Sequence, residues 1–235
     1  MSFGDTAIDE IRPTRELPGR SLLTGLIANA LGLEHREVEA LDRLQQRLRF
    51  AARLDQRGET LLDYQTALIG KKDPIWVTRG HYAERGGGTW EKEARTGRDV
   101  QTVQRYRHFR ADSIVTIALA LDPIESFPGL DAIAEALKRP ERPLFIGRKS
   151  CPPSRPILHS ACEASSLVAA LAGVPVQRTT PMRDDGPPVI ETEDAEGEPD
   201  GTSFSLADRR DWRMGFHAGL SRRRWVRAPE AGGAA

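Results

Sequence analysis

An α+β fold is predicted for this chain by three observations. Amphipathic helical patterns alternate with short apolar, β-branched segments of strand length, and one connection between them is far longer than the others. At 235 residues, the chain is long enough for one main domain with an insertion and a C-terminal extension. No run of about 18 apolar residues could cross a bilayer, and the acidic N-terminus has no signal-peptide core. We therefore take a cytoplasmic location as the default.

The first part of the predicted domain contains two helices and two strands. The sequence LLTGLIANALG has apolar residues at helical spacing, so we predict a helix with Ser21 as its N-cap and Gly32 as its stop. A second helical pattern runs from Val38 to Leu48. Residues 49–68 contain two strand-like segments around an Arg-Gly step, which is typical of a hairpin.

The second part adds a strand and two helices. Residues 112–121, DSIVTIALAL, form an apolar β-branched run that predicts a buried strand. Residues 129–138 have helical spacing, and SSLVAALAG predicts a short helix capped by Ser165 or Ser166. In chain order these elements match the β-α-β-β-α-β order of ferredoxin-like domains with the first strand absent. We therefore predict a ferredoxin-like domain over residues 1–176 and expect the natural chain to begin upstream of Met1.

The long connection, residues 71–110, is the predicted insertion of this domain. It contains ten Lys or Arg residues and five Asp or Glu residues, interleaved with aromatic side chains. Rings and cations in alternation suit single-stranded nucleic acid, because bases stack on rings while phosphates meet the cations. The alternative is an arm whose aromatic side chains pack on its own hairpin. These aromatic residues are Trp76, Tyr82, Trp90, Tyr106 and Phe109.

The C-terminal part divides into an acidic and a basic segment, although the formal net charge of the whole chain is zero. Residues 184–200 contain eight acidic residues and no basic one, whereas residues 209–227 contain seven arginines. The acidic composition predicts a flexible linker over residues 177–202, because such a segment buries too little apolar area to fold. Residues 203–235 are predicted to be a small, basic, β-rich extension.

Two loops are candidate phosphate sites. In the first, Arg20 and Ser21 begin a helix, where backbone N–H groups and the helix dipole attract anions. The alternative is that Ser21 only caps the helix and Arg20 is solvated. A nucleotide-binding P-loop is excluded, because the sequence GRSLLTG does not end in Gly-Lys-Ser/Thr.

The second loop has the sequence FIGRKSCPPSRP. Gly147 allows close backbone approach, while Arg148 and Lys149 can neutralise a phosphate and the Ser150 hydroxyl can donate to one. A solvated basic loop is the alternative. Two such loops beside one sheet favour a shared phosphate-binding surface.

The cysteines give no sign of a disulfide, metal or redox site. Only Cys151 and Cys162 are present, and cytosolic thiols normally stay reduced. A nucleophilic Cys151 would need a histidine base, and none of the five histidines lies in a recognisable catalytic motif. We interpret Cys151 as a small buried thiol, and no metal or cofactor is expected.

Five segments together resemble the CasD family. They are SFGDTAIDEIRPT, PGRSLLTGLIANALGL, LLDYQTAL, TVQRYRHFRADSIVTIAL and FIGRKSCPPSRP, and the resemblance covers residues 2–176. The family consists of subunits that bind the 5′ handle of crRNA in Cascade, the type I-E CRISPR effector complex. The resemblance implies an RRM-like domain with a thumb insertion, a CasC-type backbone subunit and a CasA-type large subunit as neighbours, and target DNA reached only through the complex.

The resemblance also implies which residues face RNA. They fall on the two candidate loops and on the base of the thumb, and no catalytic residue is carried over. The expected RNA-binding residues are Arg12, Thr14, Arg20, Ser21, Tyr64, Gln65, Tyr106, Arg107, Gly147, Arg148, Lys149 and Ser150.

The leading hypothesis is thus a non-catalytic RNA-binding subunit for antiviral DNA targeting. The alternative is a metal-independent endoribonuclease that processes pre-crRNA, with His81, Tyr82 or His108 as general base. A scaffold that acts without RNA is a third possibility, supported by the acidic linker alone.

Overall fold

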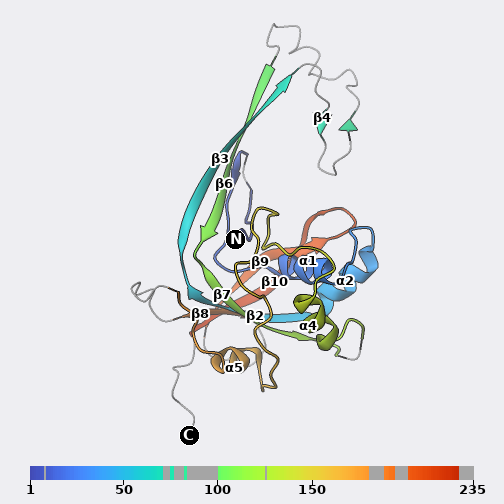
Figure 1. Cartoon of the computed structure of the whole chain (residues 1–235), viewed down its shortest axis with the longest axis vertical. Coiled ribbons are helices and arrows are strands. Elements are labelled where there is room, and N and C mark those ends of the chain that lie inside the picture. The colour runs from blue at the N-terminus through green and yellow to red at the C-terminus, as the bar shows by residue number, and fades with distance from the viewer. Residues whose placement is uncertain are drawn as a thin grey trace.

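A computed structural model describes residues 1–7, 9–70, 75–76, 82–83, 100–124, 126–179, 188–193 and 201–227. It is a mixed α/β structure in which a body of helices and sheet carries a long two-stranded arm (Figure 1). Most of the predicted insertion, residues 71–99, lies outside the described residues.

The helices and strands are named as in Figure 1. The helices are α1 (Arg20–Ala30), α2 (Val38–Arg47), α4 (Leu130–Lys138) and α5 (Leu167–Ala172), and the strands are β1 (Ile11–Arg12), β2 (Leu48–Gln56), β3 (Glu59–Gly70), β4 (Ile75–Trp76), β5 (Tyr82–Ala83), β6 (Val100–Ala111), β7 (Ile114–Leu121), β8 (Val189–Glu193), β9 (Thr202–Asp211) and β10 (Phe216–Arg227).

The body is built on a five-stranded antiparallel sheet in the order β7-β2-β8-β10-β9. The predicted strand over residues 112–121 is confirmed as β7, although its side chains are mostly half-buried. One face of β2 packs against α1, α2 and α4, where Leu44, Leu48 and Phe50 have no exposed surface. This face contains the largest apolar cluster of the described residues.

The opposite face of the sheet packs against α5. Ala51, Leu171 and Ile190 form a buried cluster there. The predicted N-cap of this helix is confirmed at Ser166, whose hydroxyl accepts from the Ala169 N–H at 3.0 Å. Side chains from successive residues of β2 thus enter two cores, because they alternate across the sheet.

The hairpin predicted for residues 49–68 is wrong. β2 pairs with β7 and β8, whereas β3 pairs with β6 in a different sheet. Gly58, with φ of +65°, marks the step between the sheets, and a Cβ there would lie 2.1 Å from the Ala111 carbonyl oxygen. A local Arg-Gly turn signal cannot show that each strand has a better partner far along the chain.

The arm is the antiparallel pair of β3 and β6, in register from Glu59 opposite Ala111 to Gly70 opposite Val100. β1 joins its base by pairing parallel to β6. In Figure 1 the arm rises away from the helices. Residues 100–110 of the predicted insertion therefore belong to β6, a strand of the arm that leads back into the body.

The flexible linker predicted over residues 177–202 is corrected at Val189–Glu193, which form β8 between β2 and β10 in the sheet. Residues 180–187 and 194–200 of this segment lie outside the described residues. Ile190, Glu191 and Thr192 are buried. The acidic composition was misleading because Glu191 is paired with Arg15 and Arg223, so its carboxylate is compensated inside the protein. The predicted β-rich C-terminal extension is present as β9 and β10, and both belong to the main sheet.

Candidate nucleic-acid interface

The N-terminus of α1, the first predicted phosphate site, is occupied by the protein's own carboxylate. The N-cap is Gly19 and not Ser21. The Arg20 backbone N–H donates to Asp208 Oδ2 at 2.8 Å, and Asp208 on β9 is 4% exposed. An internal anion therefore already satisfies the attraction that the helix end would have for a phosphate.

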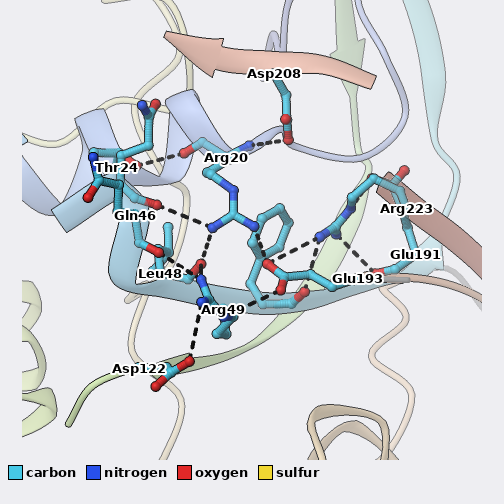
Figure 2. A network of polar contacts seen from close by, with 12 residues as sticks. Arg20, Thr24, Gln46, Leu48, Arg49, Asp122, Glu191, Glu193, Asp208 and Arg223 are labelled. Carbon is cyan, nitrogen blue, oxygen red and sulfur yellow. Dashed lines mark hydrogen bonds and ion pairs between the residues drawn. The ribbon is translucent and has the colours of Figure 1, made fainter. Parts of the chain in front are cut away.

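The Arg20 side chain also points into the protein. It is 4% exposed, and its Nη2 is paired with Glu193 (Figure 2). Its Nη1 donates to the Gln45 carbonyl oxygen at 3.2 Å. The guanidinium is thus neither solvated nor presented to a ligand. We assign Arg20 a structural role and leave it out of the proposed RNA-facing residues.

Arg20 belongs to a network of ion pairs that joins the C-terminal strands to the body (Figure 2). Arg223 has no exposed surface, its Nε lies 3.1 Å from Glu191 Oε1, and its guanidinium lies 4.0 Å from the Phe50 ring centroid. Burial lowers the pKa of Arg223, and the charge of Glu191 opposes that shift. Each buried charge therefore depends on its partner.

Replacing Asp208 by alanine is expected to lower the free energy of unfolding by about 1 to 2 kcal/mol, because a buried N–H at the helix end loses its acceptor. Urea denaturation measures the effect. Asp5→Ala is the control, since the Asp5 carboxylate also accepts from a backbone N–H but is exposed. Equal stability of the Asp208 variant and the wild type would contradict this role of Asp208.

The second predicted phosphate site, the loop at residues 145–151, is a tight turn. The Ile146 N–H donates to the Cys151 carbonyl oxygen at 2.8 Å, and the Cys151 N–H donates to the Arg148 carbonyl oxygen at 2.9 Å. Gly147 has φ of +87°, and the Ser2 N–H donates to the Ile146 carbonyl oxygen at 3.1 Å. The N-terminal segment therefore lies directly against this loop.

Arg148 lies in a group of like charges. Its guanidinium is 4.7 Å from the Phe109 ring centroid and donates to the carbonyl oxygens of His108 and Arg12 at 3.3 and 3.4 Å. The pKa of Arg148 is lowered by burial and then by the charges of Arg107 and Arg12, while the Cys151 thiol and Asp63 oppose the shift. We call Arg12, Arg107 and Arg148 the cationic cluster. An anionic ligand would relieve its repulsion.

A groove of about 560 Å³ lies beside this cluster, between α1, the loop and the turn that joins β9 to β10. It brings together four residues that the sequence analysis selected, namely Ser21, Gly147, Arg148 and Lys149. Ser150 does not line the groove.

Thr14 lies apart from these groove-lining residues. Its Oγ1 accepts from the Phe3 N–H at 2.8 Å, so it holds the N-terminal segment in place.

Among the groove residues that the sequence analysis did not select, three come from the C-terminal part of the chain: Arg210 of β9, Trp212 of the following turn and His217 of β10. Arg210 lies 5.2 Å from the Trp212 ring centroid, and His217 Nε2 lies 2.9 Å from Ser21 Oγ. Burial lowers the pKa of Arg210, and burial followed by the charge of Arg210 lowers the pKa of His217, which favours the neutral imidazole, while the charge of Asp208 opposes this shift. The sequence shows an arginine-rich tail, but it does not show that strand pairing brings this tail next to α1.

The four predicted thumb residues divide between the two faces of the arm. Tyr64 and Tyr106 are directly opposite each other, with ring centroids 5.1 Å apart. Gln65 and Arg107 are the next residues along each strand, so they point to the other face. That second face carries Phe109 and meets Arg148. Of these four residues, only Gln65 and Arg107 thus lie on the face of the arm that meets Arg148.

Other candidate chemistry finds little support within the described ranges. Cys151 is buried as predicted, Cys162 is exposed, and both thiols are free. No three His, Cys, Asp or Glu side chains of these ranges gather as a metal site would require. His81 lies outside them. None of the helices described is long and apolar enough to span a membrane.

The sequence and fold place the chain among CRISPR-associated proteins. Residues 1–224 match the profile of the Cas_Cas5 family of CRISPR-associated proteins, and the chain belongs to this family. It is 28% identical over 171 residues to CRISPR system Cascade subunit CasD of Escherichia coli (strain K12), and the match covers 73% of this chain and 70% of the relative.

Two solved structures share the fold. One is a chain of a CRISPR RNA-guided surveillance complex, with a TM-score of 0.61, 24% identity and coverage of 97% of this chain and 85% of the other. The second, described as a crystal structure of a Cas protein, has a TM-score of 0.59 and 23% identity, and covers 98% and 90% of the two chains.

Proposed function

We propose that this protein is a subunit of a CRISPR surveillance complex that holds the 5′ handle of crRNA without cleaving it. The observation that carries the proposal is the cationic cluster. Arg12, Arg107 and Arg148 lie close together, and Asp63, opposite Arg107 in the arm, is the one carboxylate whose charge opposes the pKa shift of Arg148. A polyanion would relieve the remaining repulsion among the three cations. The relationship to Cascade subunit CasD supports the choice of RNA as that polyanion.

The groove complements the cluster by offering a place for a base. Its lining includes the apolar side chains of Leu22 and Leu26 of α1 and the Trp212 ring. Lys149 and Arg210 add positive charge at its border. A phosphate held by the cluster and an unstacked base in the groove would fix one nucleotide, which is how proteins recognise single-stranded RNA.

The wider proposal includes the assembly. We infer a ferredoxin-like arrangement for the body, because β2 and β7 are antiparallel neighbours with α1 and α4 on one face. The backbone and large subunits would be its protein neighbours, and target DNA would be reached through the complex. The comparison with a surveillance-complex chain supports this fold.

Arg107→Ala combined with Arg148→Ala is expected to weaken binding of a synthetic handle RNA by about 10- to 100-fold, because two phosphate contacts are lost. Fluorescence anisotropy over a series of salt concentrations measures the affinity and shows a shallower salt dependence for the variant. Arg139→Ala is the control, since the Arg139 side chain is 88% exposed at the end of α4 and does not line the groove. Unchanged affinity of the double variant would exclude the cluster as the RNA site.

The same samples test the enzymatic alternative. Incubating pure protein with repeat RNA in EDTA and separating the products on a denaturing gel is expected to show intact RNA. Site-specific cleavage that His108→Ala abolishes would favour the endoribonuclease hypothesis instead.

A further inference from the structure

The face of the arm that carries Tyr64 and Tyr106 is not part of the proposed RNA site. Leu62 is 57% exposed and Tyr64 52% exposed on β3, and Ile11 on β1 is 48% exposed. Cross-strand register places Leu62 opposite His108 and Tyr64 opposite Tyr106. Because side chains alternate across a strand, these residues share the face that points away from Arg107. We call this surface the tyrosine face.

The tyrosine face is hollowed. A groove of about 750 Å³ is lined by Asp9, Glu10, Ile11, Leu62, Tyr106 and His108. Its lining thus combines apolar and aromatic side chains with the carboxylates of Asp9 and Glu10. Exposed apolar side chains gathered in a concave surface mark interaction sites more often than scattered ones do.

The charge of the tyrosine face differs from that of the opposite face of the arm, which carries Arg107. Asp9 and Glu10 are exposed, and neither carboxylate has an ion-pair partner within the described parts of the chain. Where arm side chains are described, the only arginine on this face is Arg110, which is 9% exposed and donates to Thr60 Oγ1 and the Arg57 carbonyl oxygen. The Arg12 guanidinium borders this face, since its Nη1 donates to the Asp9 and Ile11 carbonyl oxygens at 2.6 and 2.9 Å. Two carboxylates against this one guanidinium leave a net negative charge where a nucleic-acid backbone would lie.

We propose that the tyrosine face docks a neighbouring protein subunit, through a segment that presents one or two apolar or aromatic side chains flanked by Lys or Arg. Such a segment fills the apolar groove and pairs with Asp9 and Glu10. This inference rests on the proposed function as a complex subunit. It divides the arm into an RNA face with Arg107 and a protein face with Tyr64, so the same pair of strands contacts both partners.

The chain contains a matched pair of residues for the test. Leu61 and Leu62 are adjacent in β3, are 52% and 57% exposed, and point to opposite faces. Leu62→Ser combined with Tyr64→Ser removes apolar contact area from the tyrosine face. Leu61→Ser makes a similar change on the RNA face, and thermal unfolding checks that all variants are folded.

The experiment measures two affinities for each variant. Handle RNA binding is measured by anisotropy with the isolated subunit, and protein docking by biolayer interferometry with the purified backbone and large subunits of the same complex, without RNA. The double variant is expected to bind one of these subunits about tenfold or more weakly and to keep its RNA affinity within about twofold. Leu61→Ser is expected to keep protein docking within about twofold.

Each result that contradicts a proposal leads to a different conclusion. Equal subunit affinity of the double variant and the wild type overturns the docking proposal, as does loss of RNA affinity in that variant, which would mean that bases stack on the tyrosines. A dimer of the isolated wild-type subunit that the double variant abolishes would assign the face to a second copy and also overturn it. Failure of the wild type to bind handle RNA would reject the proposed function. The docking proposal would still be tested, because the docking measurement uses no RNA.

Discussion

Arg223→Met is expected to lower the free energy of unfolding by about 3 to 5 kcal/mol, which is the usual cost of removing one partner from a buried ion pair. The substitution keeps much of the side-chain volume but removes the charge that faces Glu191 and Glu193. It also removes the cation above the Phe50 ring. Denaturation with guanidinium chloride, followed by circular dichroism, measures the loss.

Two further variants separate the lost charge pair from lost packing. Arg222→Met changes the preceding residue of β10, which is exposed, and is expected to shift stability by about 0.5 kcal/mol or less. Adding Glu191→Gln to Arg223→Met is expected to recover part of the loss, because the buried carboxylate, which then has only Arg15 as an ion-pair partner, loses its charge as well. A single Arg223 variant as stable as the wild type would show that the network does not hold the C-terminal strands in place.

Gly147→Ala is expected to disrupt the loop of the cationic cluster. A Cβ at this position would lie 1.6 Å from the Ser2 carbonyl oxygen, and φ of +87° disfavours any side chain. The expected cost is about 1 to 3 kcal/mol of stability, accompanied by about tenfold weaker handle RNA binding, since Arg148 follows directly and moves with the loop. Thermal unfolding and anisotropy measure the two effects.

Gly129→Ala is the control for this prediction. Gly129 precedes α4 with φ of −82°, and a Cβ there would meet nothing within 4 Å. Its stability and RNA affinity are expected to match the wild type closely. If Gly147→Ala behaved in the same way, the close contact between the N-terminal segment and the loop would not exist in solution.

Local sequence signals predicted the elements whose stability is local. The helical spacing of residues 129–138 and the serine before α5 predicted elements with nearly the observed bounds. Strand partners were harder to predict, because β8 pairs with β2 across more than a hundred residues. Glu191 made β8 resemble part of a solvated linker, and only the arginines that surround it in the fold explain why it is buried.

The residues of the candidate site also divide into those that local sequence predicts and those that only long-range pairing places. Arg20 and Arg148 each follow a glycine in a loop, so the sequence predicted the same phosphate-binding role for both. The structure separates them, because Glu193, which neutralises Arg20, is 173 residues away, whereas Arg148 lies among other arginines. Arg210 and His217 reached the groove only through the pairing of β9 with β10. Long-range pairing therefore decides which cations are available to a ligand.

The Asp208 carboxylate at the start of α1 has a consequence for how ionic strength acts on this protein. Because the helix end and Arg20 are neutralised from within, they are not available to neutralise RNA phosphates and to release the cations condensed around them. The number of small ions exchanged on binding should therefore reflect only the solvent-facing guanidinium and ammonium groups, with a slope of about −0.7 per phosphate on a double-logarithmic plot for single strands. The affinity for RNA should thus fall less steeply with rising salt concentration than the number of basic residues suggests.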